Sequence, residues 1–373
     1  MSLGKVVVAM SGGVDSSVAA YLLKEAGYET IGMTMRLWSL EDPNAMMHSK
    51  RCCSVEDVDD ARRVCDVIGI PHYVVNFERE FKANVVDYFI REYRQGRTPH
   101  PCIACNQWVK FDALLKHALA LDAGFVATGH YARVERRGGG YSLLQGVDPG
   151  KDQSYVLFNL GQGELSHTLF PVGGIPKTEV RRIAAMAKLP VASKPDSQEI
   201  CFVPDGDYRG FVEQRGNATS GPIKDIEGNV LAMHPGIESF TVGQRRGLGV
   251  QSETPLYVLS IDASTRTVVV GGVEHLYSEG LWAESVSYVS CAVPERPIEI
   301  TAKYRYKSPQ VEATLHPDGS RAYVRFAEGQ RALTPGQAVV FYQGDEVIGG
   351  GVIDRVEAHC SNDRVAATVG GTN

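Results

Sequence analysis

The amino-acid sequence predicts an α/β fold: a doubly wound parallel sheet, then a small mostly β domain and a C-terminal antiparallel β-barrel. Up to about residue 200, strand-like apolar runs alternate with helical patterns, as a parallel sheet with crossover helices requires. After about Tyr208, glycine, proline and β-branched residues become frequent and helical periodicity fades. From residue 281 to 353, runs alternate with the period of two that is typical of a small antiparallel barrel. We therefore expect domains at residues 1–208, 209–280 and 281–373.

The first domain opens with a strand, a turn and a helix. Residues 6–10 contain the apolar run Val6-Val7-Val8 and are predicted to be a buried strand, and residues 16–26 are predicted to be a helix. Gly27 follows that helix, where a helix end favours glycine. Further strands are expected at residues 30–35, 72–76 and 125–128, helices from Ser54 (a capping box with Asp57) to Gly69, at 81–94 and at 111–121, an irregular insertion at 36–53, and hairpins at 221–231 and 257–271.

Bulk composition describes an ordinary globular protein. The chain has 373 residues, of which 43% are hydrophobic and 22% are charged. No stretch approaches the roughly 20 apolar residues that a membrane span needs, and no signal peptide is visible before the first strand. We therefore expect a cytoplasmic protein whose eight cysteines are buried, metal-binding or catalytic rather than disulfide-bonded.

The net charge of −6 argues against a non-specific nucleic-acid binder, whose affinity comes from neutralising phosphates. Local basic clusters nevertheless occur, and each by itself is more typical of a solvated surface than of an RNA contact. They comprise Arg133, Arg136 and Arg137; Arg181 and Arg182; Arg245 and Arg246; and Lys303, Arg305 and Lys307.

Residues 9–17 read AMSGGVDSS and connect the first strand to the first helix. A glycine-rich turn at a helix N-terminus aims backbone N–H groups at an anion, and ligands of doubly wound sheets bind beyond the carboxyl ends of the strands. The loop lacks the lysine of a G-x-x-x-x-G-K-[ST] P-loop, which disfavours an NTPase that transfers the γ-phosphate. SGGVDS instead resembles the PP-loop of ATP pyrophosphatases, which cleave ATP between the α- and β-phosphates and adenylate a substrate. The alternative is a tight strand-to-helix connection.

Three cysteines stand where they could act together. Cys102 and Cys105 form a C-x-x-C pair in a proline-rich loop at residues 96–105, and Cys201 lies at the end of the first domain. A thiol near a helix N-terminus is favoured as thiolate, which makes it a better nucleophile or metal ligand. The pair alone is also consistent with half a zinc site or a redox pair, and Cys201 with a small buried hydrophobe. Cys65, Cys291 and Cys360 are predicted to be structural, and Cys52 and Cys53 receive no role.

Several longer motifs together resemble the tRNA-specific 2-thiouridylase family, whose first domain is of the PP-loop (HUP) type. They are SGGVDS at 11–16, GRTPHPC at 96–102 with Cys105 and Asn106, ATGHYARV at 127–134, KDQSYVLF at 151–158, LFPVG at 169–173, DSQEICF at 196–202, TVGQRRGLG at 241–249, and TPGQAVVFY with GGG between 334 and 351. The blocks cover essentially the whole chain.

The resemblance implies ATP-dependent 2-thiolation of the wobble uridine of tRNA. ATP would adenylate the C2 oxygen and release pyrophosphate, and sulfur would then displace AMP. Cys105 matches the nucleophile and Cys201 the persulfide carrier, while Asp15 and Ser16 would serve ATP and Mg²⁺. The implied partners are the tRNA anticodon arm and a cysteine desulfurase or sulfur-relay protein. The implied ATP contacts are Ala9, Met10, Ser11, Gly12, Gly13, Val14, Asp15, Ser16, Met35 and Gly129; the implied tRNA contacts are His100, Pro101, Cys102, His130, Lys151, Asp152, Gln153, Arg305, Tyr306 and Gln343.

One residue departs from the family pattern, because many members carry Asp where this chain has Cys102. Cys102, Cys105 and Cys201 would then supply three thiolates to a 4Fe–4S cluster with an open iron, which could deliver sulfide to C2. Both the persulfide route and the cluster route remain open at this point.

Two other functions are compatible with parts of the sequence. A PP-loop ligase or amidotransferase acting on a small molecule accounts for SGGVDS but leaves the three cysteines and the barrel without a role. A non-catalytic tRNA-binding or ATP-sensing module would tolerate replacement of Cys105 or Asp15 by alanine.

Overall fold

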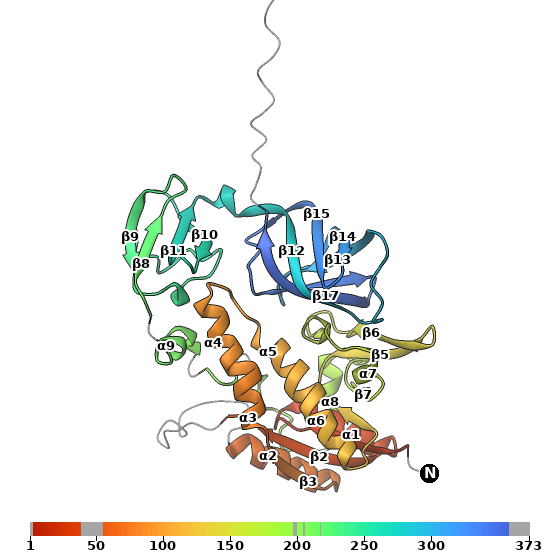
Figure 1. Cartoon of the computed structure of the whole chain (residues 1–373). Helices are drawn as coiled ribbons and strands as arrows, with labels where there is room; N and C mark the ends of the chain where they lie inside the picture. Colours follow the sequence, from red (N-terminus) through yellow and green to blue (C-terminus); the bar gives the residue numbers. More distant parts are fainter. Residues whose placement is uncertain (1–2, 39–54, 197–199, 204–205, 217, 358–373) are drawn as a thin grey trace, which may run out of the picture.

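The computed structural model describes residues 3–38, 55–196, 200–203, 206–216 and 218–357. Figure 1 shows the parallel sheet and its helices at the bottom, with a small β module and a β-barrel side by side above them. The predicted fold class is confirmed. The irregular insertion, apart from 36–38, falls outside the described residues, as do Cys52, Cys53, the capping Ser54 and Cys360.

The core of the first module is a five-stranded parallel sheet of order β3-β2-β1-β4-β7. Val6, Val7 and Val8 of β1 are fully buried, because the sheet has a separate apolar cluster on each face. Central parallel strands of this kind read as continuous apolar runs, which is why the pattern predicted β1 correctly. The strands are β1 (Lys5–Ala9), β2 (Glu29–Arg36), β3 (His72–Asn76), β4 (Phe125–Ala127) and β7 (Thr168–Leu169).

Helices pack on both faces of this sheet. One apolar cluster includes residues of α1 (Val14–Glu25), α2 (Val55–Ile68) and α8 (Lys177–Met186). The other includes residues of two long helical segments that pass through π-helical turns. The first segment comprises α3 (Glu78–Phe81), η2 (Lys82–Val86) and α4 (Asp87–Arg94), and the second comprises α5 (Pro101–Ala104), η3 (Cys105–Ala113) and α6 (Leu114–Ala120).

The second helical segment corrects the expectation that Cys102 and Cys105 lie in a loop. The helix already begins at Pro101, so both cysteines lie in its first turns. Proline fits the first helical position, because its fixed φ suits a helix and its missing N–H has no intrahelical acceptor there. The expected start at residue 111 is too late, because Pro99 and Pro101 are typical of a loop although Pro101 also suits the first position of a helix.

A hairpin that the sequence did not predict links the first module to the barrel. It consists of β5 (Ala132–Arg137) and β6 (Gly140–Gln145), and Leu144 of β6 pairs with Glu346 of β17. The chain then passes through η4 (Ser154–Leu157) and α7 (Gln162–Leu165) to reach β7.

The two predicted hairpins of the middle module are confirmed. They form a four-stranded sheet of order β10-β11-β8-β9, in which β11 and β8 run parallel. The module contains α9 (Tyr208–Glu213), β8 (Gly221–Lys224), β9 (Val230–His234), η6 (Ile237–Ser239), β10 (Tyr257–Asp262) and β11 (Thr267–Gly271).

The C-terminal module is a closed antiparallel barrel, as the period-two pattern predicted. Its strands follow the order β12-β15-β14-β13-β16-β17, and β17 pairs again with β12 to close the circle. After η7 (Val273–Leu276) the strands are β12 (Tyr277–Tyr288), β13 (Ile298–Lys303), β14 (Val311–Asp318), β15 (Arg321–Arg331), β16 (Ala338–Gln343) and β17 (Glu346–Val356). None of the helices in the described ranges is long and apolar enough to cross a membrane.

Candidate functional site

The SGGVDS turn leaves the carboxyl end of β1 and enters α1 at Val14, two residues before the predicted start. Ser16 Oγ accepts a hydrogen bond from Ser11 N at 3.2 Å, and Ser17 Oγ donates to Gly13 O at 2.7 Å. These bonds hold the turn compact. The helix N-cap is Gly13, which has no capping side chain, so the first N–H groups of α1 remain directed at the space beyond the sheet.

Glycine is required in this turn for two reasons. Gly12 has a φ of +70°, a conformation that residues with a Cβ rarely adopt. A Cβ there would also lie 2.4 Å from the backbone oxygen of Asp57 in α2. Lys194 connects the turn to α2, because its Nζ donates to Gly12 O at 3.0 Å and to Asp57 Oδ1 at 2.6 Å.

The residues expected to contact ATP come from the carboxyl ends of three adjacent strands. Ala9 ends β1, Met35 lies near the end of β2, and Gly129 follows β4. Gly129 packs directly on the start of α1, because a Cβ on it would lie 2.6 Å from the carbonyl carbon of Asp15 and from Ser16 N. The fold therefore brings these predicted residues together at one edge of the sheet.

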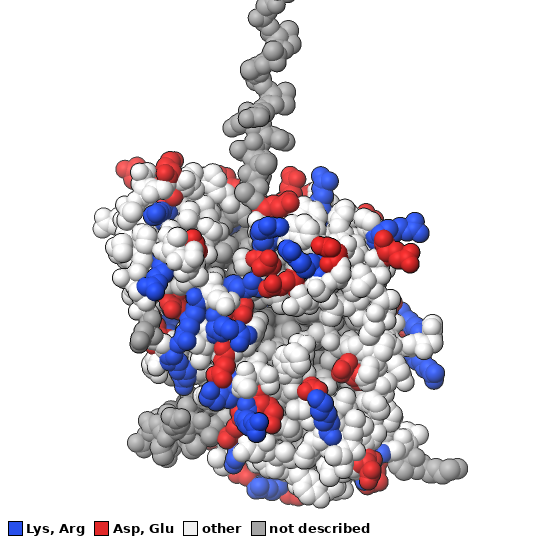
Figure 2. Space-filling view, in the orientation of Figure 1, with Lys and Arg blue, Asp and Glu red and all other residues white. Residues whose placement is uncertain are grey.

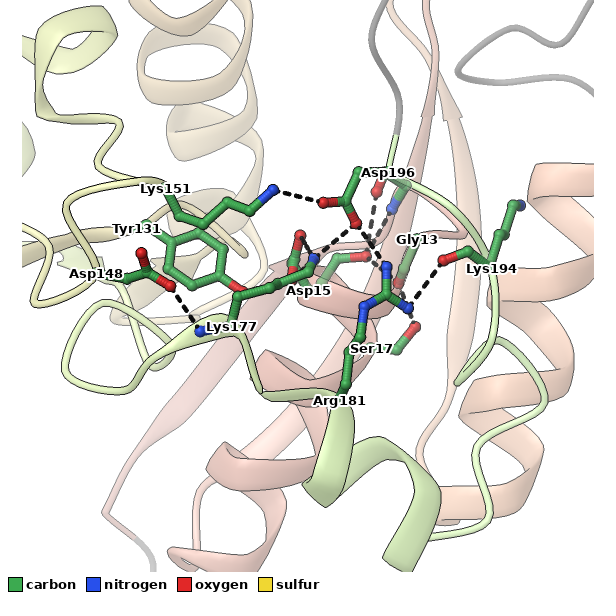
Figure 3. A network of polar contacts seen from close by, with 12 residues as sticks. Gly13, Asp15, Ser17, Tyr131, Asp148, Lys151, Lys177, Arg181, Lys194 and Asp196 are labelled. Atoms are coloured by element: carbon green, nitrogen blue, oxygen red, sulfur yellow. Dashed lines mark hydrogen bonds and ion pairs between the residues drawn. The ribbon is translucent and has the colours of Figure 1, made fainter. Parts of the chain in front are cut away.

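Asp15 points into a polar network beside the turn (Figure 3). Lys177 Nζ donates to Asp15 Oδ1 at 2.7 Å and to Oδ2 at 2.8 Å, and Tyr131 Oη donates to Oδ1 at 2.7 Å. The Lys177 side chain is only 10% exposed, so its charge is poorly screened by water. Asp15 therefore lies in the first turn of α1, and its side chain is held by Lys177 and Tyr131.

Three cations converge on a second carboxylate in this network, Asp196 (Figure 3). Its oxygens lie 2.8 Å from Lys151 Nζ, 2.9 Å from Lys177 Nζ and 2.9 Å from Arg181 Nη2. Burial by itself would raise the pKa of Asp196, but hydrogen bonds from Lys151 and Lys177 outweigh it and hold the pKa at about 2. A third carboxylate, Asp148, accepts a hydrogen bond from the backbone N–H of Lys177 at 2.9 Å, so three cations and three carboxylates face one another beside the turn (Figure 3).

Sequence reasoning did not select Tyr131, Lys177, Arg181, Lys194 or Asp196 as site residues. Tyr131 and Asp196 lie inside quoted motifs, and Lys177 is the first residue of a helix that follows the LFPVG motif. One signal for Lys177 was available: a basic residue at the start of a helix, in a sequence that also contains a phosphate-binding turn, indicates a candidate phosphate contact.

Cys105 and Cys201 contact the same apolar cluster of the first module. Cys105 is 8% exposed and belongs to the cluster, and Cys201 packs against it partly buried. Phe202 anchors the Cys201 segment, because its ring contacts those of Phe89 and Phe211 at 5.2 and 5.4 Å between centroids. Cys105 and Cys201 therefore both contact the apolar cluster on one face of the sheet. Cys102, by contrast, is exposed.

The predicted three-cysteine ligand set is not assembled. Within the part of the chain that the structure describes, no group of three His, Cys, Asp or Glu residues is arranged to hold a metal ion. The reason is that Cys105 is directed into the apolar cluster whereas Cys102 faces solvent. The residues present therefore do not fit a 4Fe–4S cluster in this conformation.

The loop before these cysteines is fixed to the barrel. Arg97 forms ion pairs with Glu92 of its own module at 2.9 Å and with Glu284 and Asp354 of the barrel at 2.5 and 3.1 Å. The next residue adds backbone contacts, since Thr98 N donates to Pro335 O at 2.8 Å.

Comparison with known proteins places these features in one family. A family model described as tRNA methyl transferase HUP domain matches residues 4–205, one described as tRNA methyl transferase PRC-barrel domain matches 209–272, and one described as aminomethyltransferase beta-barrel domain matches 278–353. The tRNA-specific 2-thiouridylase MnmA of Geotalea uraniireducens (strain Rf4) is 51% identical over 370 residues, which cover 98% of this chain and 97% of that protein. This chain belongs to the tRNA-specific 2-thiouridylase family.

A second 2-thiouridylase gives the same result. The MnmA protein of Geobacter metallireducens (strain ATCC 53774 / DSM 7210 / GS-15) is 53% identical over 356 residues, which cover 94% of this chain and 96% of that protein. The predicted family is confirmed. The domain models carry transferase names of other kinds, but the near-complete coverage by 2-thiouridylases identifies the family of the whole chain.

Several residues expected to contact tRNA in a 2-thiouridylase meet beside Cys102. The rings of His100 and Tyr306 lie 6.2 Å apart, and burial, followed by the nearby Asp152 and Cys102, raises the pKa of Tyr306. Arg305 lines an adjoining cavity of about 620 Å³ together with Thr98 and Thr241. Gln343, at the end of β16, donates to Glu299 O at 3.1 Å.

Other residues in that set are engaged inside the molecule. His130 is buried, its Nδ1 lies 2.7 Å from Thr128 Oγ1, and burial holds its pKa well below the usual value. Asp152 is buried and accepts hydrogen bonds from Gln145 Nε2 and Gly146 N at 3.1 Å each. The Lys151 side chain is 37% exposed, and its Nζ lies 2.8 Å from Asp196 Oδ2.

Proposed function

We propose that this chain performs ATP-dependent 2-thiolation of the wobble uridine of tRNA through the residues described above. The proposal rests on one arrangement. The SGGVDS turn and the buried Lys177 meet at the carboxyl end of β1, and Cys105 belongs to the apolar cluster that also contains Ala9 of β1 and Met35 of β2. Family membership supports the reaction, and the geometry supports the assignment of residues.

In the first step the C2 oxygen of uridine attacks the α-phosphorus of ATP. The bond between the α-phosphorus and the bridging oxygen breaks, and pyrophosphate leaves. The N–H groups at the start of α1 and the cations Lys177, Lys151 and Arg181 stabilise the leaving pyrophosphate, because charge builds up on it in the transition state.

Magnesium fits this step without a dedicated cage. Mg²⁺ usually binds through one or two carboxylates plus substrate phosphates, and Asp15 lies beside the turn with a side chain that is 32% exposed. Bound there with ATP, the ion would neutralise phosphate charge. Lys177 and Tyr131 hold the Asp15 carboxylate in position.

In the second step sulfur replaces AMP at C2. A persulfide on Cys201 attacks C2 with its terminal sulfur, and the C2–O bond breaks to release AMP. The Cys105 thiolate then attacks Cys201 Sγ, the bond between the two sulfurs of the former persulfide breaks, and 2-thiouridine is released with a Cys105–Cys201 disulfide. A cellular dithiol reduces that disulfide, and a cysteine desulfurase or sulfur-relay protein restores the persulfide in the cytoplasm.

A cell-based experiment tests the proposal. Cells that lack this chain are rescued with the native protein, with Cys105→Ser, or with Cys291→Ser as a control for an exposed cysteine of the barrel. Mass spectrometry of wobble nucleosides is expected to find 2-thiouridine with the native and Cys291→Ser proteins and none with Cys105→Ser. Undiminished 2-thiouridine in cells without the protein would refute the function itself.

A further inference from the structure

A basic hollow lies outside the site, where the first module meets the middle module. Its volume is about 740 Å³, and Arg94 at the end of α4, Arg215 after α9 and Arg266 in the β10–β11 turn line it. Glu238 is the carboxylate in its wall. Figure 2 shows basic side chains gathering over α4 and toward the middle module, with acidic side chains among them.

Contacts with the rest of the chain hold the guanidinium groups of Arg94 and Arg215 and the backbone of Arg266 in place. Arg215 stacks on the Phe211 ring with its guanidinium carbon 3.9 Å from the ring centroid. Arg94 Nη2 donates to Arg215 O, and the Arg94 side chain covers Gly216. In the turn, Arg266 has a φ of +56°, and its carbonyl lies 2.9 Å from His234 Nε2. Arginines with fixed planes lose little entropy when they bind a second partner.

These arginines also differ from others on the surface in their charge balance. Arg62, Arg63 and Arg182 each have an aspartate or glutamate within 3.0 Å or less. Among the residues that the structure describes, none forms an ion pair with Arg94, Arg215 or Arg266. Three such guanidinium groups facing one hollow in a protein of net charge −6 form a local anion site, because guanidinium forks match phosphate oxygens.

We propose that this hollow binds phosphodiester groups of the substrate tRNA. The inference rests on the proposed function and adds a second contact region to it. The two helices beside the hollow lead to the segments that contain the predicted site residues. After α4 the chain continues into the loop of His100, and Phe211 of α9 packs on Phe202, the neighbour of Cys201. RNA that enters the site past these segments meets the three arginines. Phosphate contacts of this kind fix the orientation of an RNA without reading its bases.

The test compares two triple variants of the full chain. R94A/R215A/R266A removes the hollow's charges, and R62A/R63A/R182A removes the same number of charges from ion-paired arginines of α2 and α8. Dissociation constants for tRNA are measured by fluorescence anisotropy at several salt concentrations. We expect the first variant to bind about tenfold more weakly and its logarithmic salt dependence to fall by about 2, since each lost phosphate contact removes about 0.7–0.9 from that slope. The second variant is expected to match the native protein.

A single substitution guards against loss of folding. Arg266→Asn removes one charge while keeping a residue type that tolerates positive φ. We expect unchanged melting, a salt slope lower by about 1 and a raised KM for tRNA, with kcat for thiolation unchanged at saturating tRNA.

Native tRNA affinity and salt slope in both hollow variants would overturn the inference. A raised KM for ATP with unchanged tRNA affinity would also overturn it and would identify a small-phosphate site. Both of these results are compatible with 2-thiouridine formation by the native protein. If the proposed function itself is wrong, the native protein forms no 2-thiouridine.

Discussion

Lys177 Nζ lies 2.7 and 2.8 Å from the two carboxylate oxygens of Asp15, although the residues are 162 positions apart. The same ammonium group lies 2.9 Å from Asp196. One buried cation thus connects the SGGVDS turn to the segment that precedes Cys201. Such a group can exchange carboxylate contacts for phosphate contacts when ATP binds, without moving far.

Lys177→Met is expected to lower the rate of tRNA-dependent AMP formation about 100-fold, because a preorganised charge near the leaving group is lost. The rate is measured with radiolabelled ATP at saturating substrates. Arg182→Met is the control, since Arg182 belongs to the same helix but is exposed and paired with Glu179. Equal rates for the two variants would show that Lys177 has no part in adenylation.

Gly129→Ala is expected to weaken ATP binding and to destabilise the protein by about 1–3 kcal/mol, because the new methyl group overpacks the start of α1. The contact is with backbone at 2.6 Å, which cannot rotate away as a side chain could. Gly124→Ala is the control, since nothing lies within 4 Å of a Cβ at that position in the described chain. Calorimetry with ATP and thermal melting measure both effects. Native ATP affinity in Gly129→Ala would contradict the placement of the turn.

The cysteine variants separate the two steps of the reaction. Cys105→Ser and Cys201→Ser are expected to keep AMP formation and to lose 2-thiouridine formation, because only sulfur transfer needs the thiols. Cys102→Asp is expected to keep both, since Cys102 is exposed and no three-residue ligand group is found in the described part of the chain. The measurement is AMP release and nucleoside mass spectrometry on the same samples, with and without an iron chelator. Loss of activity on chelation, or in Cys102→Asp, would restore the cluster route.

The sequence predicted the local features of this site and missed its long-range contacts. Continuous apolar runs identify β1, and a glycine turn before a helix identifies the loop, because both signals lie within a few residues. The partners of Asp15 could not be identified in this way, because Tyr131 and Lys177 are 116 and 162 positions away in the sequence. The place of Lys177 at a helix start is a local signal, but it does not identify Asp15 as the partner of Lys177. The sequence likewise could not say that Cys102 is exposed whereas Cys105 is buried, because counting thiols does not say which way a helix turns them.

The final prediction concerns His100, whose ring contacts the rings of Tyr155 and Tyr306, which also contact each other. Its Nδ1 is buried with no hydrogen-bond partner among the described residues. Burial lowers the pKa of His100 to about 4, and the interaction of the ring with the residue's own backbone opposes that shift only in part. The folded chain therefore keeps this imidazole neutral.

Stability is expected to depend on this histidine only in acid. Between pH 4 and 6.5 the unfolded chain binds more protons than the folded chain, so the free energy of unfolding falls as pH is lowered and is level above pH 6.5. The loss at pH 5 amounts to about 2 kcal/mol for a group with these two pKa values. Urea unfolding at pH 5 and pH 7.5 measures it, and His100→Leu is expected to lose that part of the difference, whereas the exposed control His275→Gln is expected to keep it. An undiminished pH dependence in His100→Leu would mean that other buried groups, such as His130, account for it.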